Sequence, residues 1–229
     1  MKNIVVLSGA GVSAESGVKT FRDAGGLWEG FDVMDVASID GWIKDKSLVL
    51  DFYNQRRRQL FTVEPNIAHY EIAKLEESHQ VTVVTQNVDD LHERAGSSKV
   101  IHLHGELLKV RGVNSSKEEI YWDKDLHLGD KNAKGEQLRP AIVWFGEQVP
   151  KIDEAVLEIA QCDILIIIGT SLQVYPAAGL VGVAKKAKQI FYVDPNPASS
   201  YETKALQNLT VIPKPATTGI LDVLDMIEK

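Results

Sequence analysis

The chain has a single cysteine, Cys162, among 229 residues, so no disulfide framework can form within it. It also lacks an excess of basic side chains: 25 Lys and Arg face 32 Asp and Glu, a net charge of −7, which argues against nucleic-acid binding. No apolar run is long enough to cross a bilayer, and the N-terminus lacks a signal-peptide core. These absences predict a cytoplasmic protein that binds neither nucleic acid nor membrane.

Short apolar segments alternate with segments that can form helices. The expected strands are 3–8, 81–86, 100–103, 141–145, 163–169 and 189–193, and the expected helices are 10–16, 88–95, 176–187 and 199–207. Such alternation indicates a parallel sheet with helices on both faces. Residues 164–168 are all apolar, as in a central strand. We therefore expect an α/β fold with a doubly wound parallel sheet.

Two stretches interrupt this alternation. Residues 27–68 contain no strand candidate and are typical of helices, while 107–137 are polar and look like an insertion. The first stretch carries four aromatic residues that could form a small core: Trp28, Trp42, Phe52 and Tyr53. We predict a small second domain from 27–68 and 107–137, and a large domain from 1–26, 69–106 and 138–229.

The most informative segment follows the first expected strand. Gly9-Ala10-Gly11 would let the turn approach a ligand closely, and the residues after Gly11 can open a helix whose free N–H groups face a phosphate. With Ala14 at the place of the third glycine, the pattern is typical of dinucleotide binding. An ordinary tight turn would give a similar pattern.

Polar side chains follow two further strands. Gln86, Asn87 and Asp89 lie at the carboxyl end of the strand at 81–86, where helix capping would need only one of them. Alternation would place His102 and His104 on one face of the next strand. Because no nearby Cys or third His completes a metal site, we expect either structural histidines or a general acid–base.

Three other segments place ligand-binding groups at strand ends. Residues 143–147 are either core or an edge that an extended peptide could pair with. Gly169-Thr170-Ser171 could bind a phosphate or a ribose, and Asp194 could bind a ribose hydroxyl. Each signal is weak alone, but their common location makes the set strong. Cys162, just before the central strand, is expected in the core.

In this order, the motifs resemble the sirtuins, which are NAD-dependent protein-lysine deacylases. The matching segments are GAGVSAESGVKTFR at 9–22, TQNVDDLHERAG at 85–96, HLHG at 102–105, VWFGE at 143–147 and GTSLQVYPAAG at 169–179. HGELLKVR at 104–111 is similar to bacterial members of the class III branch. The resemblance covers most of the chain and implies a Rossmann-like large domain with a small domain formed by two insertions.

The resemblance also implies the roles of individual residues. His104 would be the catalytic base, and Asn87 would take part in catalysis. NAD would contact Gly9, Ala10, Gly11, Phe21, Arg22, Trp28, Gln86, Asn87, Asp89, Gly169, Thr170, Ser171, Asp194, Pro195, Asn196 and Ala216. The substrate would lie against Val143, Trp144, Phe145, Gly146 and Val174. Asp194 stands where the family usually has Asn, and either can bond a ribose hydroxyl.

The implied cofactor is NAD, and the implied partners are proteins with acylated lysines. The acyl group would move to a ribose hydroxyl, giving free lysine, nicotinamide and O-acyl-ADP-ribose. The alternatives are an NAD-dependent dehydrogenase or an ADP-ribosyltransferase with the same dinucleotide fold. A binding module without catalysis is a third, although His104, Asn87 and Asp89 together argue against it.

Two residues in the first insertion predict which acyl groups the enzyme removes. Tyr53 and Arg56 lie three residues apart and share a face of the expected helix. In the class III branch, a Tyr-x-x-Arg pair here binds a carboxylate at the end of the acyl chain. A solvated helix face is the alternative, which suits Arg57 and Arg58 better. We expect activity on succinyl- and malonyl-lysine as well as on acetyl-lysine.

The chain differs from the family at the structural zinc site. Sirtuins commonly hold a structural zinc with two cysteine pairs, but here Lys131 and Lys134 stand at the second pair, and the first falls near Gly112 and Ser115. None of these is a plausible zinc ligand, so we expect no metal. We expect Glu118 or Asp123 to pair with lysines of this insertion, and an apolar cluster to hold it: Ile120, Tyr121, Trp122 and Leu126.

Overall fold

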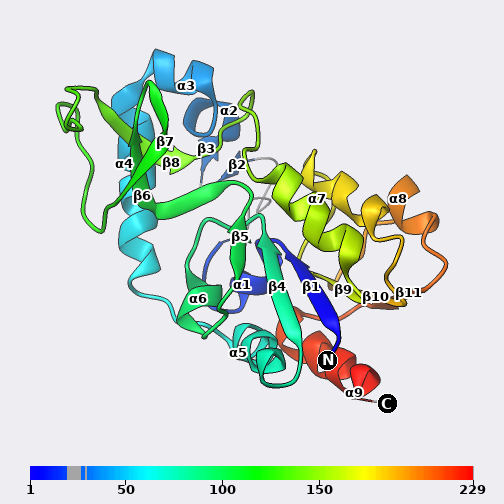
Figure 1. The fold of residues 1–229 in the computed structure, drawn as a ribbon. Helices are drawn as coiled ribbons and strands as arrows, with labels where there is room; N and C mark the ends of the chain where they lie inside the picture. The colour runs from blue at the N-terminus through cyan, green and yellow to red at the C-terminus, as the bar shows by residue number, and fades with distance from the viewer. Residues whose placement is uncertain (20–26, 29, 229) are drawn as a thin grey trace.

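The computed structural model describes residues 1–19, 27–28 and 30–228; the NAD contacts expected at Phe21 and Arg22 lie outside them. A six-stranded parallel sheet has the order β11-β10-β9-β1-β4-β5 (Figure 1). Its strands are β1 (Asn3–Ser8), β4 (Gln80–Thr85), β5 (Val100–His102), β9 (Ile164–Ile168), β10 (Gln189–Val193) and β11 (Leu209–Ile212). The predicted fold class, a Rossmann-like doubly wound sheet, is confirmed.

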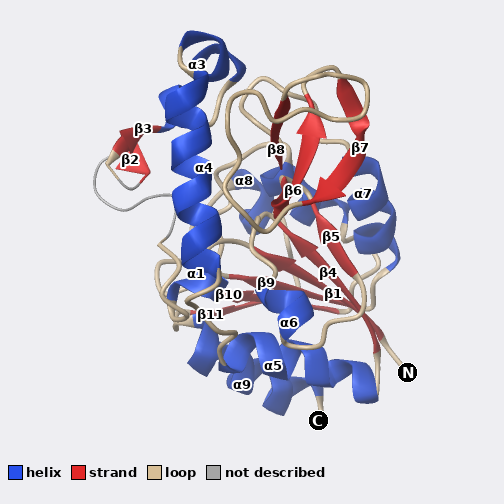
Figure 2. Ribbon diagram, turned by 90° about the vertical axis from the view of Figure 1, so that its left-hand side faces the viewer, coloured by secondary structure: helices blue, strands red, loops and turns tan. Residues whose placement is uncertain are grey.

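Helices cover both faces of this sheet (Figure 2). On one face, α5 (Ile67–Lys74) and α9 (Ala216–Ile227) pack with Ile4 and Val6 of β1. On the other, α7 (Ile152–Gln161) and the 3₁₀ helix η2 (Ala177–Val183) pack with Val5 and Leu7. Since successive residues of a strand face opposite sides, strands covered on both faces need apolar residues on both: residues 4–7 of β1 are apolar and buried, and β9 is apolar and buried at every position.

The chain reverses its direction of winding between β1 and β9. From β1 it runs outward through β4 and β5 on one side, and the later strands β9, β10 and β11 occupy the other side. In open α/β sheets, the crevice outside the carboxyl ends at such a reversal is where ligands bind. The expected site residues follow these strands.

A smaller module packs beyond the carboxyl ends of the sheet (Figure 1). It contains α2 (Val33–Val36), α3 (Ile39–Lys44), α4 (Lys46–Leu60) and an antiparallel sheet of order β7-β6-β8. The strands of that sheet are β6 (Gly105–Gly112), β7 (Ser115–Tyr121) and β8 (Leu138–Ile142). Ser38 and Asp45 cap α3 and α4 by accepting backbone N–H bonds. Trp42, Phe52 and Tyr53 are buried in the core between helices and sheet, as predicted, and Trp28 packs against it.

Several predicted elements were wrong in place or length. The strand expected at 141–145 is β8, which ends at Ile142 and pairs with β6 in the antiparallel sheet. The stretch expected to lack strands contains the two-residue strands β2 (Leu27–Trp28) and β3 (Phe31–Asp32). The helices expected after β1, β4 and β10 shrink to α1 (Gly11–Ala14), α6 (Leu91–Arg94) and α8 (Tyr201–Lys204). A 3₁₀ turn, η1 (Leu75–Glu77), follows α5.

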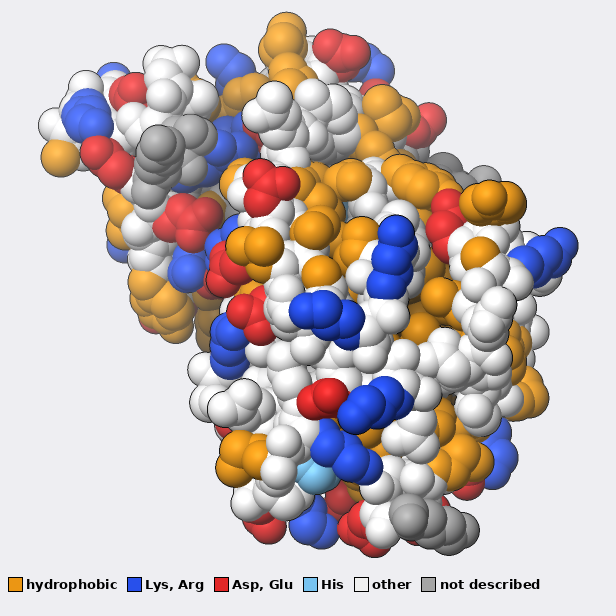
Figure 3. Space-filling model, turned by 45° about the vertical axis from the view of Figure 1, so that its right-hand side comes forward, with side chains coloured by type: hydrophobic (Ala, Val, Ile, Leu, Met, Phe, Trp, Pro, Cys, Tyr) orange, Lys and Arg blue, Asp and Glu red, His pale blue; other side chains and the backbone are white. Residues whose placement is uncertain are grey.

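The face shown in Figure 3 mixes cationic and anionic side chains with apolar ones, and neither charge sign covers it alone. Within the described part of the chain, no helix is both long and apolar enough to span a membrane.

Candidate active site

Two glycine turns meet at the point where the winding reverses. The Gly11 N–H donates to the Gly169 carbonyl oxygen at 2.8 Å, which joins the turn after β1 to the turn after β9. A side chain at Gly11 would place its Cβ 2.8 Å from the Gly169 Cα, and Gly169 has φ +61°. Both positions therefore require glycine. The absence of side chains at these positions lets the two turns pack directly against each other.

Asp89 is the centre of a buried polar cluster above β4. Its Oδ2 accepts a hydrogen bond from Ser13 Oγ at 3.0 Å, and its Oδ1 accepts one from the Leu91 N–H. Asn87 Nδ2 donates to the same Ser13 oxygen at 3.1 Å. Burial raises the pKa of Asp89 to about 6, despite these bonds. The cluster brings the predicted Asn87 and Asp89 together and adds Ser13 from α1.

His69 extends this cluster from α5. Its Nδ1 accepts a hydrogen bond from the Asn66 backbone N–H, so the ring proton lies on Nε2, which faces Ser13 Oγ at 3.4 Å. Burial lowers the pKa of His69 to about 4, so the ring stays neutral. Sequence analysis missed this residue, and no local motif marks it. Ser13 lies within the quoted motif at 9–22 and could have been found there.

His104 follows β5 with one ring nitrogen bound and the other available. Nδ1–H donates to the Gln86 carbonyl oxygen at 3.0 Å, because a carbonyl can only accept. Nε2 is therefore the lone-pair nitrogen that can take a proton. Burial lowers the pKa of His104 below its ordinary value, which the bond to Gln86 opposes only in part. The imidazole is thus neutral at physiological pH, as a general base must be.

His102 has a structural role. β5 ends at this residue, so the expected alternation with His104 does not extend past it. Its Nδ1 donates to the Asn87 carbonyl oxygen at 2.9 Å, and its Nε2 lies 2.7 Å from Glu93 Oε1. Burial lowers the pKa of His102, but the bond to Glu93 outweighs this and raises it. The buried ring ties the loop after β4 to α6.

The phosphate and adenosine ends of the predicted site lie at β9, β10 and α9. Gln86 Nε2 donates to Thr170 Oγ1 at 2.9 Å, which joins two predicted NAD contacts. Asp194 accepts from the Asn196 N–H in a tight turn after β10. Ala216 is the first residue of α9, and Glu15 accepts bonds from Thr217 N and Oγ1 at 3.0 and 2.7 Å. Glu15 thereby joins α1 to the start of α9.

A small apolar hollow lies between the two modules. Its walls include Trp28, Val88, Asp89, Leu107 and Arg56. The Arg56 guanidinium carbon lies 4.7 Å from the Phe52 ring centre and 5.6 Å from that of Trp28. Of the predicted acyl-binding pair, only Arg56 lines the hollow. Tyr53 is fully buried behind it and accepts a hydrogen bond from Trp144 Nε1 at 3.0 Å.

The segment predicted to bind substrate follows β8. Val143 N–H donates to the His104 carbonyl oxygen, and Phe145 N–H donates to the Ala37 carbonyl oxygen, each at 2.9 Å. Trp144 is buried, whereas Phe145 is 42% exposed. The segment therefore lies beside His104, with its apolar side chains divided between core and surface. Val174 lies in the turn between β9 and η2.

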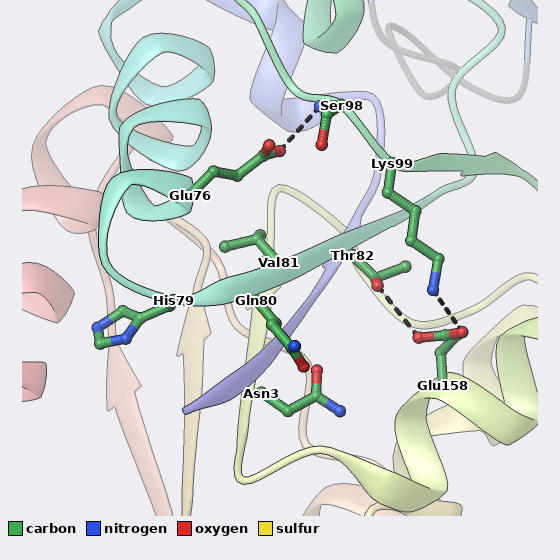
Figure 4. A pocket seen from close by; sticks show the side chains of 9 residues that line it. All are labelled: Asn3, Glu76, His79, Gln80, Val81, Thr82, Ser98, Lys99 and Glu158. Carbon is green, nitrogen blue, oxygen red and sulfur yellow. Dashed lines mark hydrogen bonds and ion pairs between the residues drawn. The ribbon is translucent and has the colours of Figure 1, made fainter. Parts of the chain in front are cut away.

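Other candidate groups have no role at this site. A second hollow, of about 450 Å³, lies at the amino ends of β1 and β4 (Figure 4). Lys99 and Thr82 both contact Glu158 there, and the Ser98 N–H donates to Glu76.

Cys162 is buried, as expected, and burial raises its thiol pKa to about 11. Among residues 1–19, 27–28 and 30–228, no cluster of His, Cys, Asp or Glu could hold a metal ion.

Known proteins resemble this chain along most of its length. The sequence profile of the Sir2 family matches residues 9–176. An NAD-dependent protein deacylase of Helicobacter pylori is 58% identical over 224 residues, 98% of this chain and 94% of that protein. An NAD-dependent protein deacylase of Bacteroides thetaiotaomicron is 48% identical over 236 residues, 99% of this chain and 98% of that protein.

Solved structures share the fold. The complex of a Sir2 homologue with NAD superposes with a TM-score of 0.86 at 34% identity, covering 98% of this chain and 89% of that one. Sir2 bound to acetylated peptide superposes with a TM-score of 0.80 at 27% identity, covering 98% of this chain and 93% of that one. The profile match and the nearly full-length relatives lead to one conclusion: this chain belongs to the Sir2 family.

Proposed function

We propose that the chain is an NAD-dependent protein-lysine deacylase that removes acetyl, succinyl and malonyl groups in the cytoplasm. The observation that carries this is the neutral His104, whose Nδ1–H is held by the Gln86 carbonyl and whose Nε2 is available beside the Asn87–Asp89 cluster. The donors and acceptors at the strand ends suit NAD, because polar side chains that can bind ribose and carboxamide groups lie beside the two joined glycine turns.

We assign a step of the reaction to each of three residues, according to the chemistry of its side chain. When bound, NAD supplies a ribose carbon open to attack and nicotinamide as its leaving group. Asp89, fixed by Ser13 and Leu91, would orient the nicotinamide carboxamide, and Asn87 would hold the ribose. His104 Nε2 would accept the proton of a ribose hydroxyl. Acyl-lysine, NAD and water are then converted to lysine, nicotinamide and O-acyl-ADP-ribose.

The other NAD contacts carry over as proposals. They comprise Gly9, Ala10, Gly11, Phe21, Arg22, Trp28, Gln86, Gly169, Thr170, Ser171, Asp194, Pro195, Asn196 and Ala216. We also propose that residues 1–26, 69–106 and 138–229 form the NAD-binding domain and that 27–68 and 107–137 form the small domain. β8 (Leu138–Ile142) falls within 138–229 by sequence, but it pairs with β6 in the sheet of the small module.

Arg56 supports activity on acidic acyl groups. It is 8% exposed, packs on two aromatic rings and lines the apolar hollow that also contains Asp89. A guanidinium there can bind a carboxylate through two charge-assisted bonds. Tyr53 would support it from behind, with its hydroxyl fixed by Trp144. Arg56 would therefore bind succinyl and malonyl groups, whose acyl chains end in a carboxylate, in addition to any acetyl group that the site accepts.

We further propose that the small domain needs no zinc. At the positions expected for the first cysteine pair, Ser115 Oγ donates to Glu136 Oε2, and Asn132 Nδ2 donates to the same oxygen at 2.7 Å. A Cβ at Gly112 would collide with that carboxylate. Lys134 pairs with Glu118 at 2.6 Å, as expected. Leu126 is buried and Trp122 partly so, but Ile120 and Tyr121 are exposed, so the expected apolar cluster was half wrong.

One assay separates this proposal from its alternatives. The purified protein is incubated with NAD and with acetyl-, succinyl- and malonyl-lysine peptides of one sequence, while lysine product, free nicotinamide and absorbance of NADH are followed. We expect NAD-dependent loss of all three acyl groups with release of nicotinamide. Formation of NADH would indicate a dehydrogenase, and ADP-ribose on protein without deacylation would indicate an ADP-ribosyltransferase.

A further inference from the structure

Glu147 concentrates four hydrogen bonds on one carboxylate. It accepts from Arg139 Nη1 at 2.8 Å and Nη2 at 3.0 Å, and from Arg111 Nη2 at 3.0 Å. The fourth donor is the backbone N–H of Trp144, at 2.8 Å. Two guanidinium groups from the β6–β8 pair are thus joined to the segment 143–146 through a single side chain.

The same carboxylate also fixes the ring of Trp144. The Arg139 guanidinium carbon lies 3.3 Å from the centre of that ring, and Arg139 Nη2 donates to the Ile142 carbonyl oxygen. The indole N–H in turn donates to the Tyr53 hydroxyl at 3.0 Å. Glu147 therefore holds Trp144 directly by its backbone and, through Arg139, by its ring.

The backbone held in this way lies beside the base. Val143 N–H bonds the His104 carbonyl oxygen, and Phe145 N–H bonds that of Ala37 on the small module. The Glu147 N–H donates to the Trp144 carbonyl oxygen at 2.9 Å and closes the turn. A change at Glu147 would therefore alter the path of the chain between His104 and the small module.

We propose that Glu147 is the positioning residue of the substrate-binding segment: through the turn at 144–147 it holds residues 143–146 in the path beside which the backbone of an acylated peptide binds. This inference rests on the proposed deacylase function. An added strand gains affinity through backbone hydrogen bonds, so the path of the receiving strand sets the peptide affinity. Glu147 itself need not touch the substrate.

The electrostatics agree with a permanently charged anchor. Burial alone would raise the pKa of Glu147, but the hydrogen bonds from Arg139 and from the Trp144 N–H lower it below its ordinary value. Glutamine would keep the shape and one accepting oxygen, but it would lose the charge that two arginines share. Glu147→Gln therefore loosens the strand without changing the bulk of the side chain.

The test compares two substrates in Glu147→Gln. One is an acetyl-lysine peptide of about ten residues, and the other is a single acetyl-lysine with blocked ends, which lacks flanking residues. Since hydrogen bonds to charged groups are worth about 1.5–3 kcal/mol, KM for the peptide should rise at least about tenfold. KM for the single residue and KM for NAD should stay within about twofold. A merely structural role would shift all three together.

Glu118→Gln is the matched control, because Glu118 lies on the same antiparallel sheet and pairs with exposed Lys134. It should leave every KM unchanged. If Glu147→Gln fails to fold, Arg111→Gln replaces it, because Arg139 still holds the carboxylate there, and a peptide-selective rise of about 2–5-fold is expected. Wild-type KM values for the peptide in the folded variant would overturn the inference while leaving the deacylase proposal intact. A wild-type protein inactive on both substrates would overturn the deacylase proposal and, with it, this inference.

Discussion

Ionisable groups have opposite pKa shifts in two regions of the molecule. One region is the site above the parallel sheet, and the other is the three-stranded sheet beside it. At the strand ends, Asp89 and His69 are buried and His104 is partly buried, and burial shifts each pKa toward the neutral form. At the three-stranded sheet, charges are kept: Arg111 and Arg139 both donate to Glu147, whose pKa is lowered.

This difference suits two tasks. A proton acceptor and a carboxamide-binding group are most useful when they are neutral or easily become so near physiological pH. A strand that receives a peptide, or a pocket that receives an acidic acyl group, needs fixed donors and charges instead. We therefore propose that the large sheet carries the chemistry and that the three-stranded sheet and its helices carry the specificity.

The largest effect should come from the base. His104→Tyr removes the neutral imidazole and should lower kcat by roughly 10²–10⁴-fold, the usual contribution of general-base catalysis. Binding of ADP-ribose, followed by calorimetry, should persist and serves as the control for folding. In the wild type, the acid limb of kcat/KM should lie below pH 6.5, because burial lowers the pKa of His104. Near-normal activity of a folded His104→Tyr protein would remove this residue from its role.

A smaller effect belongs to the acyl pocket. Arg56→Met keeps the length of the side chain but removes its charge, and a charge-assisted bond of about 1.5–3 kcal/mol corresponds to a roughly 10–150-fold loss of kcat/KM on succinyl-lysine. Activity on acetyl-lysine, measured in parallel, should change far less. Arg58→Met is the control, because Arg58 is exposed and pairs with Asp125. An unchanged ratio of succinyl to acetyl activity in Arg56→Met would show that Arg56 does not read the carboxylate.

Asp89 should give a smaller effect, visible in stability against pH. Its pKa in the folded protein is about 6, above the ordinary value of 3.8, so its protonated form favours folding. That contribution is full below about pH 4 and is lost as pH rises through 6; by linkage it amounts to about 3 kcal/mol at most. Urea unfolding of wild type and Asp89→Asn from pH 4 to 7 should therefore show a difference that changes with pH. A difference that stays constant over this range would contradict the pKa assigned to Asp89.

Much of the fold could be predicted from the sequence because its signals are local. The apolar run at β9 is enough to predict a buried strand, and the glycines at Gly11 and Gly169 are enough to predict tight turns. β8 was misplaced because its apolar residues would suit either sheet, and the choice is made by pairing with β6, 30 residues earlier. His69 was missed for a similar reason: only the packing of α5 against α1 brings its ring to Ser13.

Residue spacing could predict only part of the proposed acyl-binding site. Spacing put Tyr53 and Arg56 on one helix face, and both are buried. It could not show that Trp144, 91 residues away, holds the Tyr53 hydroxyl while Arg56 alone lines the hollow. The contact depends on β8 and α4 meeting across the small-module core.

The smallest expected effect is that of chelators. If hydrogen bonds from Ser115 and Asn132 to Glu136 hold the small module, EDTA or phenanthroline should leave both Tm and activity unchanged. Elemental analysis of the purified protein should find no zinc. Glu136→Ala should lower Tm, because it removes the shared acceptor. One zinc per chain, with activity lost on chelation and restored by zinc, would overturn the proposal that the module is metal-free.

The most direct test of the central claim follows the acyl group itself. A peptide carrying ¹⁴C-acetyl-lysine is treated with the enzyme and NAD, and the label and nicotinamide are both quantified. Because His104 is proposed to deprotonate a ribose hydroxyl, we expect one nicotinamide for each acetyl group removed and the label on ADP-ribose. Label released as free acetate without stoichiometric nicotinamide, or NADH among the products, would contradict this expectation.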